Sequence, residues 1–165
     1  MKTNKKVRKI NSVLSFFIVS NSIEGIDDIV DSTRTVTLFN QVKHASLELI
    51  MYEVHRKMRH LNSYCKAGKL RDYAVRVGTK KCLDHTEIIK KLAILFKEEP
   101  TTVQQILKWH VKFEKIHPFG DGNGRIGRFL MLVQATKQNV ELPDMFFSIE
   151  ELENNRSTYY ALFKN

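Results

Sequence analysis

Residues 117–128 read HPFGDGNGRIGR, and this glycine-rich stretch lies between two segments whose apolar spacing predicts helices. Pro118 ends the preceding helix at His117, so the imidazole projects from a helix terminus into a loop. Gly122 and Gly124 leave room for backbone amides to approach a ligand, and the helix that follows points its positive end at the same place. The stretch therefore predicts an anion-binding site.

The side chains of this stretch supply the groups that phosphoryl transfer needs. Arg125 and Arg128 lie three residues apart on the first turns of the following helix, so both can reach a polyphosphate with fork-shaped donors. Asp121 offers a hard oxygen ligand for the Mg²⁺ that accompanies a nucleoside triphosphate. The imidazole of His117 is the group suited to take a proton from a hydroxyl near neutral pH. A glycine-rich turn can also be a mere helix start, but the convergence of these groups favours a catalytic site.

The same residues resemble the Fic family pattern HPFx(D/E)GNGRxxR at every constrained position. The resemblance implies an all-α protein with the Fic fold, a helical bundle with one small β-hairpin flap, as a single Fic domain over residues 1–165. It also implies an adenylyltransferase that moves AMP from ATP to a Ser, Thr or Tyr hydroxyl of a target protein.

The resemblance assigns a role to each matched position. These roles are general base for His117, magnesium ligand for Asp121, anion hole for Asn123 with the amides of Gly122 and Gly124, phosphate contact for Arg125, and γ-phosphate anchor for Arg128. Relatives that phosphorylate their targets resemble this pattern with a lysine at position 124, so the glycine there favours AMP transfer. ATP as substrate and Mg²⁺ are the implied small molecules.

An inhibitory motif of the same family, (S/T)xxxE(G/N), is similar to the segment from Ser20 to Gly25. The resemblance implies that Glu24, at the end of an N-terminal inhibitory helix at about 10–25, pairs with Arg128 and takes the room of the γ-phosphate. The competing interpretation is an ordinary helix end with a glycine stop. A basic segment followed by the apolar run 13–19 also resembles a short secretion signal, but Ser15 interrupts the run, so we expect the segment to be retained.

Two further alternatives for function stay open. Some relatives with this glutamate remove AMP from a modified target at the same site, and the sequence does not separate removal from addition. The other alternative is a basic nucleic-acid-binding module. It is disfavoured because five units of the formal charge of +9 come from the lysines and arginine within residues 2–9, which leaves +4 for the rest.

The expected partner is a target protein docked along a flap hairpin at about 72–84, where Tyr73, Val75 and Val77 alternate before a Gly78–Thr79 turn. Relatives with this arrangement often form dimers, which makes a homodimer the family expectation. No apolar run approaches the roughly 20 residues of a membrane span. Two cysteines without paired spacing favour the cytoplasm.

Apolar spacing and helix caps predict the remaining helices. They are expected over residues 10–24, 37–61 with Thr37 as the cap, 86–97, 101–116 with a capping box of Thr101 and Gln104, 123–138, and from Ser148 onward.

Overall fold

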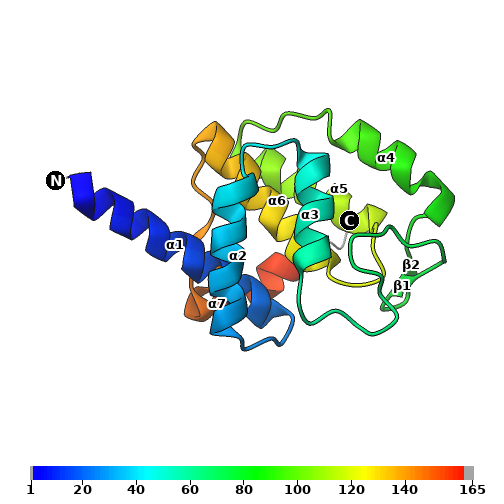
Figure 1. Ribbon diagram of the computed structural model, residues 1–165, viewed down its shortest axis with the longest axis horizontal. Coiled ribbons are helices and arrows are strands. Elements are labelled where there is room, and N and C mark those ends of the chain that lie inside the picture. Colours follow the sequence, from blue (N-terminus) through cyan, green and yellow to red (C-terminus); the bar gives the residue numbers. More distant parts are fainter. Residues whose placement is uncertain (1, 162–165) are drawn as a thin grey trace. The chain divides into compact units, whose positions relative to one another are not determined.

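A computed structural model describes the backbone of residues 2–161 and the side chains of residues 12–161, so the side chains of the basic segment lie outside the described part (Figure 1). Within that part the regular elements are helices apart from one two-stranded antiparallel hairpin, which confirms the predicted all-α class with a small hairpin. No described helix is both long and apolar enough to cross a membrane. The elements in chain order are α1 (Lys2–Ile23), α2 (Ile29–Val42), α3 (Leu47–Lys57), β1 (Arg76–Val77), β2 (Lys80–Lys81), η1 (His85–Glu87), α4 (Ile88–Leu95), α5 (Val103–Ile116), α6 (Asn123–Gln138), η2 (Asp144–Phe146) and α7 (Ile149–Ala161).

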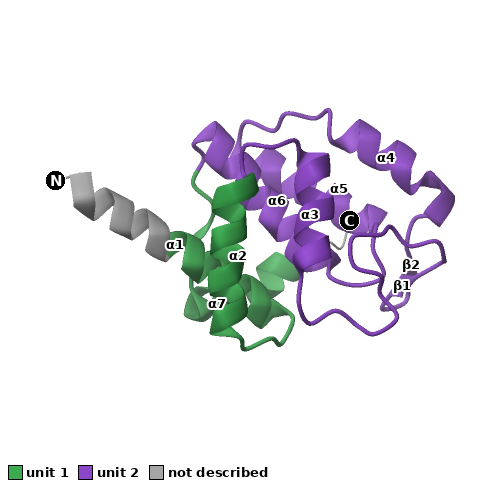
Figure 2. Ribbon diagram, viewed as in Figure 1, with its two compact units in different colours: residues 1–42, 141–165 green, residues 43–140 purple. Residues whose placement is uncertain are grey.

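The chain divides into two compact units, one made of residues 1–42 and 141–165 and the other of residues 43–140 (Figure 2). In the first unit, α1 packs against α2, and the short helix η2 packs against α1 and α7. Aromatic rings fill its core, since Phe16 lies 6.2 Å from Phe146 and Phe17 lies 6.0 Å from Phe39 between ring centroids. The prediction of one domain over residues 1–165 stays a prediction.

In the second unit, α6 packs against both α5 and α3, and α4 packs against α5. A helix enclosed in this way should be apolar around most of its surface. Accordingly, Phe129, Leu130, Met131 and Val133 of α6 are each at most 1% exposed. The helix occupies residues 123–138, as the sequence predicts, and ends at Asn139 in the left-handed conformation. This packing fixes the start of α6, where the glycine-rich stretch lies.

The single helix expected over residues 37–61 is wrong, because the structure has two helices there. The first, α2, ends before α3 begins at a new cap, where the Ser46 hydroxyl accepts a hydrogen bond from the Leu49 amide at 3.3 Å. Thr37 is not a cap, since its hydroxyl bonds back to a carbonyl four residues earlier inside α2. A local cap at Ser46 therefore interrupts a stripe of apolar residues that continues through both helices.

The hairpin lies within the predicted range of about 72–84 and is short. Arg76 pairs with Lys81 and Val77 with Lys80, and all four strand residues are exposed. Gly78 takes a φ of 59°, which the tight turn requires and which a side chain would strain. Because the hairpin is the whole sheet in the described chain, its backbone edges are not covered by further strands.

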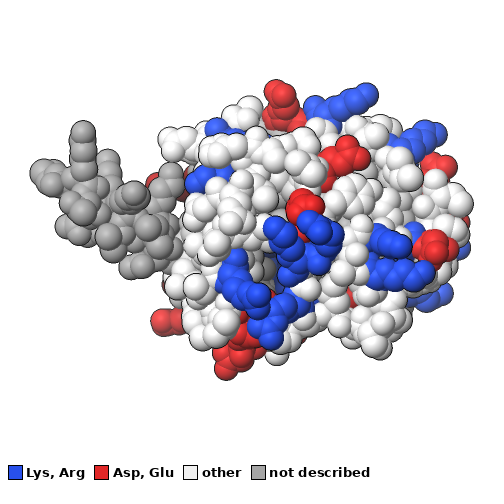
Figure 3. Space-filling view, viewed as in Figure 1, with Lys and Arg blue, Asp and Glu red and all other residues white. Residues whose placement is uncertain are grey.

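Positive charge on the face shown in Figure 3 is mixed with acidic side chains. Lysine and arginine side chains gather there over the C-terminal end of α3, where Arg56 and Lys57 lie 2.7 and 3.8 Å from the Glu53 carboxylate. Exposed pairs of this kind add little stability.

The helix α5 begins one residue later than expected, and its cap can be tested. Thr102, not Thr101, accepts the Gln105 amide, while the Gln105 side chain accepts the Thr102 amide. We expect Thr102→Ala to lower the free energy of unfolding by about 1 kcal/mol in urea denaturation, because an orphan helix amide loses its acceptor. Thr101→Ala removes only an exposed hydroxyl contact to Gln105 and should cost less. Equal losses in the two variants would contradict the assigned cap.

Candidate active site

His117 leaves the end of α5 in a backbone conformation that positions the loop. Its φ is 51° and its ψ is 62°, and its amide still bonds to the Phe113 carbonyl at 3.1 Å. A non-glycine residue in the left-handed region is uncommon and must be held by its surroundings. The next segment is anchored by Phe119, which is fully buried and stacks on His55 with ring centroids 3.7 Å apart.

Asn123 shapes the turn of the loop. Its side-chain oxygen accepts the Phe119 amide and its side-chain nitrogen donates to the Phe119 carbonyl, both at 2.9 Å. The side chain is 2% exposed, so this pair is a buried clamp across the loop. The oxygen and the nitrogen of the Asn123 side-chain amide therefore both have a hydrogen-bond partner in Phe119. The predicted contribution of Asn123 to an anion hole stays a prediction.

The N-terminus of α6 faces the loop without a side-chain cap. Gly122 is the capping residue, with a φ of 80°, and its carbonyl receives the first helical bond from Ile126. The amides before Ile126 have no acceptor inside the helix, which makes the helix start a site for an anion. A Cβ at Gly122 would lie 2.7 Å from the Met58 sulfur, so the flexible Met58 side chain would have to shift. The positive φ is therefore the main reason that glycine is favoured here.

Asp121 presents a carboxylate that backbone amides hold in place. One oxygen accepts the Asn62 amide at 2.8 Å, and the other accepts the Gly122 amide at 2.6 Å. A carboxylate has about four acceptor positions, so both oxygens keep capacity for a cation. The described residues contain no group of three or more histidine, cysteine or acidic side chains arranged for a metal. One carboxylate does not complete the coordination of Mg²⁺, so the other ligands of an ion held there would have to be phosphates and water. The predicted role of Asp121 as a magnesium ligand stays a prediction.

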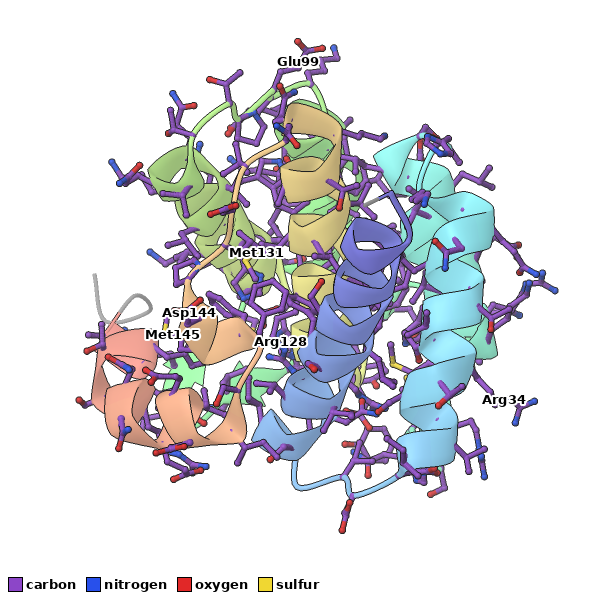
Figure 4. The ribbon with its side chains drawn as sticks, turned by 90° about the vertical axis from the view of Figure 1, so that its left-hand side faces the viewer. Arg34, Glu99, Arg128, Met131, Asp144 and Met145 are labelled. Carbon is purple, nitrogen blue, oxygen red and sulfur yellow. The ribbon has the colours of Figure 1, made fainter. Side chains whose placement is uncertain are left out.

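The two arginines differ in how they are held. Arg125 is 7% exposed and donates to the carbonyls of Arg59 at 2.7 Å and of His60 at 3.0 Å, so it fixes the segment that follows α3. Arg128 is 2% exposed and lies one turn before Met131 on α6 (Figure 4). The predicted contacts of both arginines with phosphate stay predictions. Two N–H groups of Arg125 already donate to the carbonyls of Arg59 and His60, so a phosphate would have to accept from its other N–H groups.

A buried histidine lies beside α6 near Arg128. His110 is fully buried, and burial together with the Arg128 charge lowers its pKa to about 3. The backbone of Gly127 acts on the pKa of His110 in the opposite direction. Gly127 makes this arrangement possible, because a Cβ there would meet Glu114 Oε1 at 2.6 Å and His110 Nδ1 at 2.7 Å. The helix thus approaches α5 closely at the turn that carries Arg128.

The sequence did not reveal His55, which supports the loop from α3. Its Nδ1 accepts the Gly68 amide at 2.8 Å, so the other ring nitrogen carries the proton and donates to the Asp121 carbonyl at 3.1 Å. Burial is the largest cause that lowers the His55 pKa, and the Arg125 charge lowers it further. The only sequence feature that could have indicated His55 is its position on the buried stripe of a helix.

Arg71 is the second residue that the sequence did not reveal. Its guanidinium donates to the carbonyls of His117 and Tyr73, each at 2.7 Å, and of Leu83 at 2.6 Å, and its amide donates to the Pro118 carbonyl at 2.9 Å. No sequence pattern predicts such contacts for an arginine in an irregular segment before a hairpin.

The predicted inhibitory residues lie in the first unit. Ser20 is buried within α1, whereas Glu24 is exposed just beyond its end, and Gly25 takes a φ of 70°. The neighbouring Asn21 side chain donates to Asp31 at 3.3 Å and to Ser32 at 3.1 Å, which fixes the end of α1 on α2. The inhibitory role of this segment remains a prediction.

The fold and the loop together define a helical protein with a glycine-rich loop at the start of a buried helix. The profile of the Fic/DOC family matches residues 45–135, and the chain belongs to this family. It is similar to protein adenylyltransferase fic-1 of Caenorhabditis briggsae, with 26% identity over 148 residues, which is 86% of this chain and 28% of that protein. Its fold is also that of a Fic family protein from Desulfovibrio desulfuricans G20, with a TM-score of 0.61, 19% identity and coverage of 93% of this chain and 55% of that one. The chain thus spans about a quarter to a half of the length of these relatives.

The neutral state of His110 predicts a dependence of stability on acid pH. The unfolded chain takes up a proton near pH 6.5, whereas folded His110 takes one up only near its pKa of about 3. Between these values the unfolded state binds more protons, so the free energy of unfolding should fall by about 1.4 kcal/mol per pH unit as the pH decreases. Urea denaturation between pH 7.5 and 5 measures this slope.

The variant His110→Gln should flatten the slope, because the variant side chain cannot take up a proton. His55→Gln should remove a further part, since burial lowers the pKa of His55 in the same direction. An unchanged slope in both variants would show that other groups control the acid sensitivity.

Proposed function

We propose that this protein transfers AMP from ATP to a hydroxyl of a target protein. The observation that carries the proposal is the gathering of His117, the Asp121 carboxylate and the uncapped start of α6 within one loop, with Arg128 one turn further on. Similarity to a protein adenylyltransferase supports AMP as the transferred group.

In this proposal the backbone amides at the start of α6 and Arg128 bind the triphosphate, and the rigid carboxylate of Asp121 holds Mg²⁺. The metal neutralises charge on the phosphates. His117 takes the proton from a target Ser, Thr or Tyr hydroxyl as its oxygen attacks the α-phosphorus, and pyrophosphate leaves as the new P–O bond forms. Most of the rate enhancement then comes from positioning and charge stabilisation.

The hairpin is the proposed docking element for the target. Its strands are exposed and have uncovered edges, and an extended segment can add to such an edge by main-chain hydrogen bonds. We further propose the reducing cytoplasm as the compartment, since Cys65 and Cys82 are both free thiols. A homodimer remains the expectation from the family resemblance.

The base and the metal ligand are tested by two substitutions. His117→Ala should abolish modification with labelled ATP, and Asp121→Asn should lower it about a hundredfold or more, because a neutral amide holds Mg²⁺ poorly. His44→Ala, at an exposed position outside the loop, is the matched control and should keep full activity. Retention of activity in His117→Ala would refute the assignment of the base.

We also propose that Glu24 restrains this activity, on the strength of the spacing from Ser20 to Gly25. Glu24→Gly should raise self-modification severalfold, because it removes the carboxylate that would pair with Arg128, and a pair with an exposed partner is worth about 1 kcal/mol. Asp27→Gly is the matched control, since Asp27 is an exposed acid in the same turn region. Equal rates in Glu24→Gly and the wild type would remove the restraint from the proposal. Removal of AMP from a modified target by the wild type, lost in Glu24→Gly, would instead assign the reverse reaction to this site.

A further inference from the structure

Arg71 is a buried cation whose guanidinium donates hydrogen bonds to four main-chain carbonyl oxygens. The side chain is 4% exposed, and it donates to the carbonyls of Tyr73, Leu83, Ile116 and His117 at 2.7, 2.6, 3.3 and 2.7 Å. Burial lowers the pKa of Arg71, but an arginine remains charged throughout the physiological range. A planar fork of five donors can satisfy four carbonyls at once, which a lysine ammonium cannot do.

These four carbonyls come from two parts of the second unit that are distant in sequence. Tyr73 and Leu83 stand before and after the hairpin, so Arg71 closes the base of the hairpin from both sides. Ile116 and His117 form the C-terminal end of α5, where a cation is also favoured by the helix dipole. One side chain therefore connects the base of the hairpin to the residue proposed as the general base.

The connection reaches His117 at the point where its backbone is strained. The residue adopts a φ of 51°, and its carbonyl accepts from Arg71 Nε while the Pro118 carbonyl accepts from the Arg71 amide. A left-handed conformation at a non-glycine residue persists only where neighbours over-determine it. Arg71 supplies two of those constraints, so its loss should release the backbone that aims the imidazole.

We infer that Arg71 is a positioning residue that couples the hairpin to His117, so that a target segment pairing with the hairpin is aligned with the base. This inference rests on the proposed function and adds to it a residue outside the 117–128 loop. The rival account is that Arg71 is a general structural residue whose loss loosens the whole unit. The two accounts differ in their expectation for the affinity for ATP. The guanidinium of Arg71 donates hydrogen bonds neither to α6 nor to the Asp121 carboxylate, so a positioning residue should leave the affinity unchanged, whereas loosening of the whole unit should lower it.

The experiment compares Arg71→Lys and Arg71→Met in the Glu24→Gly background. Arg156→Lys is the matched control, since Arg156 is an exposed arginine that pairs with Glu153 on its own helix. Amide hydrogen exchange is followed for residues 72–84, 116–119 and 123–138, and the affinity for ATP with Mg²⁺ is measured beside the rate of AMP transfer. The exchange and affinity measurements need no catalytic turnover.

Arg71→Lys should speed exchange in residues 72–84 and 116–119 together by about tenfold or more, because several charge-assisted hydrogen bonds are lost. The transfer rate should fall by a similar factor, while the dissociation constant for ATP stays within about twofold. Arg156→Lys should change none of these. If the Arg71→Met variant unfolds, as shown by fast amide exchange in residues 123–138, the results for Arg71→Lys alone decide between the two accounts.

Faster exchange in only one of the two segments would overturn the coupling, and so would a loss of ATP affinity in step with the rate. Unchanged exchange and rate in Arg71→Lys would overturn it as well. If the Glu24→Gly parent transfers no AMP, the proposed function fails, and the exchange measurements still decide whether Arg71 joins the two segments.

Discussion

Side-chain hydrogen bonds to main-chain groups hold residues 117–128 in a single conformation. Asn123 clamps both polar atoms of Phe119, and the Asp121 carboxylate receives two amides. His55 donates to the Asp121 carbonyl from outside the loop. The first amides of α6 have no side-chain cap and no acceptor within the helix, and an anion is the partner that such amides favour. The rest of the second unit serves to keep this arrangement fixed.

The buried charges of the second unit favour the same partner. Arg125 and Arg128 are nearly inaccessible, and their charges help to lower the pKa values of His55 and His110 respectively. Both histidines are therefore neutral near pH 7, and they neither add to nor cancel the positive charge around the start of α6. The arginines and the helix dipole contribute positive potential around the start of α6, and the Asp121 carboxylate beside it contributes negative potential.

Local patterns in the sequence were sufficient for some features and insufficient for others. The bounds of α6 follow from glycine at its start and asparagine at its end, and the hairpin follows from alternation around Gly78. The break between α2 and α3 was missed, because an apolar stripe with helical spacing continues across it and the cap at Ser46 is a single residue. Within the candidate site, the motif supplied the residues of the loop itself. Arg71 and His55 were missed because their partners lie 46 and 66 residues away in the chain, and no local pattern encodes such a distance.

All four oxygens that Arg71 engages belong to the polypeptide backbone. Every residue type provides a carbonyl, so the amino acids at those four positions are free to diverge among related chains without breaking the contact. Selection would act on the arginine alone and on the path of the backbone around it. A comparison of distant homologues should then find an invariant guanidinium surrounded by variable neighbours, and covariation between these positions would be weak even though they touch.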